Sequence, residues 1–203
     1  GTIRYFLSIL AMTFVQMGVF IYAQKILSGS FVNEDSGQTW QAFMLQIFFL
    51  APYILMVFFA GFFTNRFSKN KVLAWSSLMM TVFVIAQAIL VTCNTPRVAF
   101  WLSIGLSCGF AIHSAAKYGI LKEMFGVRNL SFANAFLQIF GLGGIICASW
   151  LAVVGVNLIN LESLKSYAAV HRITSESLVI PWILAGVGVL GTVASFMVPK
   201  VKY

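Results

Sequence analysis

Long apolar segments alternate with short polar stretches along this chain of 203 residues. A helix needs about 20 apolar residues to cross the hydrocarbon core of a bilayer, where its backbone must be hydrogen-bonded internally. Six segments meet this length, namely residues 5–26, 42–63, 72–91, 98–116, 132–154 and 178–198. The pattern predicts an all-α polytopic membrane protein, a single bundle of six transmembrane helices.

The composition excludes an ordinary soluble domain. Hydrophobic residues make up 60% of the chain and charged residues only 9%, whereas about 25% charged residues is usual in soluble proteins. A net charge of +8 suggests nucleic-acid binding in a soluble protein, but here the cations lie in short clusters between apolar segments. We therefore expect membrane lipid as a partner, and no nucleic acid.

The distribution of Lys and Arg predicts the orientation, because cytoplasmic loops carry an excess of cations. With the N-terminus inside, nine cations face the cytoplasm: Arg4, Arg66, Lys69, Lys71, Lys117, Lys122, Arg128, Lys200 and Lys202. Four lie on the other side: Lys25, Arg97, Lys165 and Arg172. Both termini are therefore expected to be cytoplasmic.

The longest connection runs from Gly155 to Ser177. Asn160 is a possible N-cap within it, and apolar residues recur at helical spacing: Leu158, Leu161, Leu164, Tyr167 and Ala168. A short helix on the outer membrane surface and an irregular loop both remain open.

Signals for catalysis or metal binding are missing from the sequence. There is no HxxxxD pair and no P-loop, and the one GxSxG spacing, at residues 105–109, lies inside an apolar segment that predicts a helix rather than a strand-to-helix turn. Three cysteines, Cys93, Cys108 and Cys147, form no CxxC pair. We expect no catalytic residue, no metal and no cofactor in this chain, although an enzymatic domain elsewhere in a longer parent protein is compatible with it.

The turn between the second and third segments is strongly basic, with Gly61, Asn65, Arg66, Lys69 and Lys71. On charge alone, a positive-inside anchor explains it as well as a functional element does. Its spacing resembles the cytoplasmic signature of the major facilitator superfamily, although Asn65 replaces that signature's Asp. The resemblance implies one half of a facilitator fold, built from two inverted three-helix repeats, and a gating role for this turn.

A second stretch narrows the resemblance. Residues 114–121 read Ser-Ala-Ala-Lys-Tyr-Gly-Ile-Leu, similar to Ser-Pro-Ala-Lys-Tyr-Gly-Ile-Leu in bacterial lysophospholipid transporters, a module also found fused to acyltransferase and acyl-carrier-protein synthetase domains; residues 129–135 agree. The resemblance implies passage of a lysophospholipid, lysophosphatidylethanolamine, across a bacterial inner membrane for reacylation. It also implies a second six-helix half and, as a further partner, an acyltransferase.

Polar residues inside apolar segments are the candidates for the substrate path. His113 and Lys117 share one helix face, and ionisable groups at membrane depth usually face an aqueous path. Gln16 stands in the region where the resembling family has an acid. Asn134 and Gln138 share a face by their i+4 spacing. For all five, a structural role in interhelical hydrogen bonding is the open alternative.

Five glycines are expected where helices pack closely: Gly105, Gly109, Gly141, Gly143 and Gly144. They suit ordinary packing or a rocking interface equally well.

Two further functions stay open for the whole chain. One is a permease for a small polar solute, and the other is a membrane anchor that binds an acyltransferase without transporting anything.

Overall fold

Six helices form the part of the chain that the computed structural model describes, residues 2–31, 38–93, 96–150 and 175–198. They are α1 (Thr2–Phe31), α2 (Gln38–Arg66), α3 (Lys69–Thr92), α4 (Pro96–Phe125), α5 (Leu130–Trp150) and α8 (Ser175–Phe196). No strand occurs in these ranges, so the all-α prediction is confirmed. The helix considered at residues 158–168 lies outside the described residues.

Each helix overlaps one of the apolar segments, and most extend beyond it into polar sequence. Four stretches within these ranges are long and apolar enough to cross a membrane: Thr2–Ile21, Lys69–Thr92, Leu130–Trp150 and Val179–Phe196. The 30 residues of α4 span about 45 Å at the helical rise, more than a hydrocarbon core of about 30 Å. The last turns of α4 therefore extend past the apolar layer.

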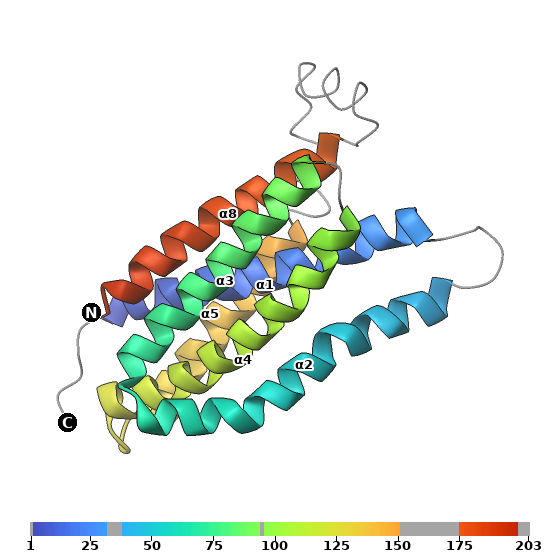
Figure 1. The fold of residues 1–203 in the computed structure, drawn as a ribbon. Helices are drawn as coiled ribbons and strands as arrows, with labels where there is room; N and C mark the ends of the chain where they lie inside the picture. Colours follow the sequence, from blue (N-terminus) through green and yellow to red (C-terminus); the bar gives the residue numbers. More distant parts are fainter. Residues whose placement is uncertain (1, 32–37, 94–95, 151–174, 199–203) are drawn as a thin grey trace.

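The helices pack in a repeated pattern (Figure 1). Helix α1 packs against α5 and α8, helix α4 packs against α2 and α3, and α3 packs against α8. If α1 is exchanged with α4, α2 with α5 and α3 with α8, the α1–α5 pair becomes α4–α2 and the α1–α8 pair becomes α4–α3. The α3–α8 pair is unchanged. The first three helices and the last three therefore share one contact pattern.

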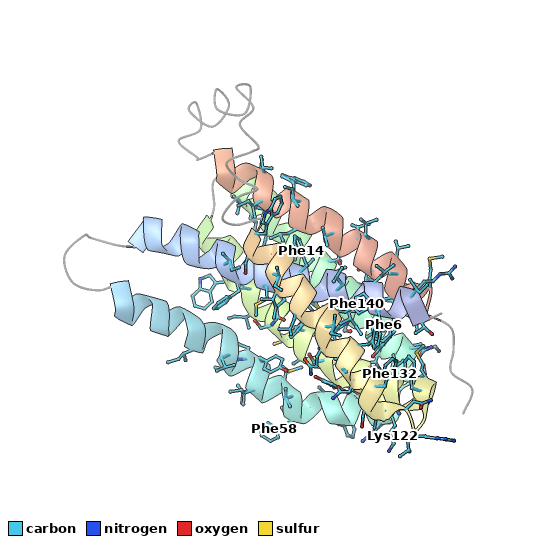
Figure 2. The ribbon with its side chains drawn as sticks, turned by 180° about the vertical axis from the view of Figure 1, so that it is seen from behind. Phe6, Phe14, Phe58, Lys122, Phe132 and Phe140 are labelled. Atoms are coloured by element: carbon cyan, nitrogen blue, oxygen red, sulfur yellow. The ribbon has the colours of Figure 1, made fainter. Side chains whose placement is uncertain are left out.

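The outer surface of the bundle is apolar. On α2, Phe58 is 78% exposed and points away from the other helices (Figure 2). Phe132 on α5 and Leu190 on α8 are exposed as well. A soluble monomer rarely exposes continuous apolar surface of this extent, whereas lipid is the natural solvent for it. The fold is that of a multi-pass membrane protein.

Glycines mark two close helix crossings. A Cβ on Gly144 of α5 would lie 2.8 Å from the Leu10 carbonyl oxygen and 3.0 Å from the Phe14 nitrogen of α1. On α4, a Cβ on Gly109 would lie 2.9 Å from Met80 Cγ of α3. Only a residue without a side chain allows such an approach.

The other glycines named above differ in their surroundings. Gly105 faces the Phe83 ring, and a Cβ on Gly143 would lie 3.2 Å from Leu10 Cδ1. Around Gly141 a Cβ would meet nothing within 4 Å. Gly141 is therefore not at a close helix contact among the described residues.

Candidate functional site

Lys117 carries a cation that lies against aromatic rings. Its Nζ is 5.7 Å from the centroid of the Phe110 ring and 5.2 Å from that of Tyr118, within cation–π range. Within the described ranges no carboxylate forms an ion pair with it. The side chain is partly buried. The ammonium is thus positioned by neutral groups, which leaves its charge available to an anion.

Helix α1 fixes the backbone at the same point. The Tyr5 hydroxyl donates a hydrogen bond of 2.5 Å to the main-chain carbonyl of Lys117. Tyr5 is completely buried, and its ring packs edge-on against Phe6 at 5.3 Å. The Lys117 backbone is therefore held between α1 and its own helix.

Helices α2 and α5 complete the surroundings of Lys117. The Gln138 amide of α5 donates a hydrogen bond of 3.5 Å to the Tyr118 hydroxyl, and Asn134 lies one turn earlier on α5, exposed like Gln138. The Tyr53 ring of α2 lies 6.0 Å from the Phe110 ring. The structure thus brings Lys117 and Gln138 to one region, together with three aromatic residues that the sequence candidates did not include. Only Tyr118, which follows Lys117 directly, was signalled by the motif.

Gln16 lies elsewhere along α1. It is partly exposed and follows Tyr5 by 11 residues, a distance of about 16 Å along a helix. Because Tyr5 marks the level of Lys117, Gln16 lies at a different depth of the bundle, and it makes no hydrogen bond to the Lys117 region.

His113 belongs to a buried chain of hydroxyl groups. The ring is 1% exposed, and its Nδ1 lies 3.2 Å from Ser77 Oγ of α3. The Ser77 hydroxyl lies 2.8 Å from Ser195 Oγ of α8, which in turn contacts the Ser8 hydroxyl of α1. His113 Nε2 has no hydrogen-bond partner. One side chain from each of four helices thus joins this hydrogen-bonded network. Its three serines gave no sequence signal, because serines are common in all these helices.

In the basic turn, Lys69 forms an ion pair with Glu123 near the end of α4. Its stem crosses Gly119, where a Cβ would lie 2.8 Å from Lys69 Cδ. Glu123 was not among the sequence candidates. A signal existed, since it is the only one of the five acidic residues on the side expected to be cytoplasmic. The pair ties the start of α3 to the end of α4.

The remaining residues of the turn point outward. Asn65, Arg66 and Lys71 are exposed, and a Cβ on Gly61 would meet nothing within 4 Å. The Arg66 guanidinium lies 5.9 Å from the centroid of the Phe62 ring. Of the five residues singled out in this turn, the structure brings only Lys69 to another helix.

Fold and site together define the class: a multi-pass helical membrane protein with a lysine cation inside the bundle that no described carboxylate neutralises. Three curated proteins, each named lysophospholipid transporter LplT, are weakly similar to the chain. Those of Pectobacterium carotovorum and Cronobacter sakazakii are 29% identical over 110 residues, and that of Yersinia enterocolitica is 28% identical over 118 residues.

These matches cover 54% to 58% of the chain, and they span only 26% to 28% of the relatives' own length. No family model matches the chain, and no solved structure does.

Proposed function

We propose that the chain forms one half of a facilitator-type transporter that moves a lysophospholipid across a bacterial inner membrane for reacylation. The similarity to three lysophospholipid transporters over about half of the chain supports it. The match spans about a quarter of those relatives. A second six-helix half completes the substrate path in this proposal, and an acyltransferase is the enzyme that uses the product. No catalytic step is assigned to this chain.

The contact pattern supports the repeat architecture. Two inverted three-helix repeats would place α1, α2 and α3 in positions equivalent to α4, α5 and α8. The helix pairs of the bundle are related by this same exchange. We propose that both termini are cytoplasmic, in agreement with the excess of cations at that end.

The observation that carries the assignment of substrate class is the placement of Lys117. A phospholipid headgroup contains a phosphate, and a lysine ammonium is a compact charge with three donors that suits it. Lys117 lies over two rings with no carboxylate in ion-pair range among the described residues. We assign it to the phosphate, with Gln138 and Asn134 as further polar contacts.

The surroundings also suit an acyl chain. The Phe110 and Tyr118 rings beside the Lys117 ammonium are apolar, and the Tyr53 ring of α2 adjoins Phe110. A ligand with a charged headgroup and one acyl chain satisfies both kinds of surface, whereas a small polar solute would leave the apolar surface uncovered. This favours a lysolipid over a polar solute.

Further roles in the proposal follow from position. Gln16 lies along the same path at another depth. His113 supports the Phe110 ring in this proposal: its own ring is stacked on Phe110 at 6.4 Å, and the Lys117 ammonium also lies over Phe110. The ion pair of Lys69 with Glu123 regulates opening, because it joins the basic turn to the helix that carries Lys117.

The test is flux of labelled lysophosphatidylethanolamine in proteoliposomes that contain the intact protein. We expect Lys117→Gln to lower the flux at least tenfold. Lys122→Gln is the matched control, since it removes the same charge from an exposed position on the same helix, and it should retain flux within about twofold.

Undiminished flux in the Lys117→Gln variant overturns the site. Flux of a soluble polar solute without lysolipid movement identifies a permease instead. Stable association with an acyltransferase and no flux at all identifies an anchor.

A further inference from the structure

A group of four exposed cations lies at the end of the bundle where the α2–α3 turn and the α4–α5 turn come together (Figures 1 and 2). Arg66 ends α2, Lys71 lies in the first turn of α3, Lys122 lies in the last turn of α4, and Arg128 lies in the turn before α5. We call these four residues the basic rim. The Lys69 ion pair with Glu123 joins the two turns.

The basic rim is not neutralised by the described part of the protein. The carboxylate at this end, Glu123, is already paired with Lys69. Within the described ranges none of the four cations of the rim lies in ion-pair range of an acid. The rim therefore presents an uncompensated positive field at the boundary of the apolar layer.

The position of Arg66 indicates that the positive charge of the basic rim faces the lipid boundary. Its guanidinium lies 5.9 Å from the centre of the Phe62 ring, and Phe62 is 59% exposed on the outer surface of α2. A cation over an outward-facing ring is held at the lipid boundary. Beside the cations, Phe67 is 54% and Val127 is 78% exposed. Positive and apolar groups thus alternate along one edge.

We propose that the basic rim binds the headgroups of anionic phospholipids in the adjoining leaflet. Such a lipid places its phosphate against the cations and its upper acyl region against Phe67 and Val127, so it satisfies both kinds of surface. An acidic soluble protein would match only the charges. This inference goes beyond substrate transport, because it concerns diacyl lipids of the surrounding bilayer.

Lipid binding by the rim must be distinguished from a second explanation, that these cations only orient the protein during membrane insertion. An orientation signal acts before the fold is complete and gives the inserted protein no preference among lipids. A binding site retains such a preference afterwards, and the preference weakens with salt because the cations are exposed. The two explanations therefore differ in a measurement on the folded protein.

The experiment uses the purified intact protein in nanodiscs of phosphatidylethanolamine with 0% to about 30% phosphatidylglycerol, and counts retained lipids by native mass spectrometry. Each cation near an anionic surface contributes about a fivefold change in affinity. We expect Arg66→Gln, Lys71→Gln and Arg128→Gln each to lower phosphatidylglycerol retention by about this factor, and increased salt to lower it in the wild type.

Two controls make the result decisive. Arg97→Gln removes a cation from the opposite end of the sequence-predicted topology, and it should leave retention unchanged. Lys117→Gln should also leave it unchanged, so that lipid bound at the proposed substrate site is told apart from lipid at the rim. If wild-type protein retains both lipids equally, or if the rim variants match Arg97→Gln, the proposal is wrong whether or not transport occurs.

Discussion

The Tyr5 hydroxyl donates a hydrogen bond to the main-chain carbonyl of Lys117, and the two residues are 112 positions apart in sequence. The bond joins the first turns of α1 to the helix that carries the proposed headgroup cation. It therefore sets the height of Lys117 relative to α1.

Tyr5→Phe is expected to lower stability only slightly, because the carbonyl keeps its bond within α4. Interhelical hydrogen bonds in membranes contribute about 0.6 kcal/mol on average. Thermal unfolding of the detergent-purified protein should show a decrease of a few degrees at most, while lysolipid flux should fall more than this loss implies. Wild-type flux in a variant with lowered stability would argue that the bond has no positioning role.

Gly144→Ala is expected to destabilise the protein by about 1 to 3 kcal/mol, because overpacking a close contact forces the backbone to move. The added Cβ would lie 2.8 Å from the Leu10 carbonyl oxygen. Gly141→Ala on the same helix is the matched control, since its Cβ meets nothing within 4 Å and alanine favours a helix by up to about 1 kcal/mol. Denaturation in detergent measures both, and equal effects would contradict the proposed crossing.

Exchanging the charges of the Lys69 and Glu123 pair tests the gate. Both side chains are only about one-fifth exposed, so breaking the pair is expected to lower stability as well as flux, because a largely buried charge loses its partner. Lys69→Glu alone should reduce flux by placing two carboxylates together, and adding Glu123→Lys should restore it. Failure of the double variant to recover would show that the pair itself is not what matters.

Ser77→Ala should destabilise the bundle by about 0.5 to 1.5 kcal/mol, the net contribution of a typical hydrogen bond, because Ser195 keeps its bond to the Gly191 carbonyl and His113 Nδ1 keeps its contact with Ser76. It removes the hydroxyl that contacts both His113 Nδ1 and Ser195 Oγ. Ser76→Ala is the control, since Ser76 lies 3.5 Å from the same ring nitrogen and does not contact Ser195. The midpoints of thermal unfolding should differ clearly between the two variants. Equal midpoints would show that Ser77 has no special role in the hydrogen-bonded network.

The sequence predicted the number of helices well because the need for long apolar segments is a local property. The predicted spans end where the apolar sequence ends, whereas the helices continue beyond them: α4 continues past residue 116 to Phe125. Outside the hydrocarbon layer hydropathy no longer decides the structure, and the polar residues there simply continue the helical hydrogen bonding. Glu123 lies in this extension.

Tertiary contacts explain the remaining differences. Ser8 and Ser195 meet across 187 positions of sequence, and no spacing rule connects them. Gly141 and Gly144 lie on one helix three residues apart, yet only Gly144 touches α1. The side on which a neighbouring helix lies decides such cases, and a single sequence does not contain that information.

Side-chain hydrogen bonds join four of the six described helices, α1, α3, α4 and α8. They involve the hydroxyls of Ser8, Ser77 and Ser195 and the His113 imidazole. Sliding any one of α1, α3, α4 or α8 lengthwise past its neighbours would break at least one of these buried polar contacts. Helices α2 and α5 contribute no described side chain to these contacts; α2 packs chiefly against α4, and α5 chiefly against α1 (Figure 1). A displacement of α2 or α5 would therefore leave the buried polar contacts intact.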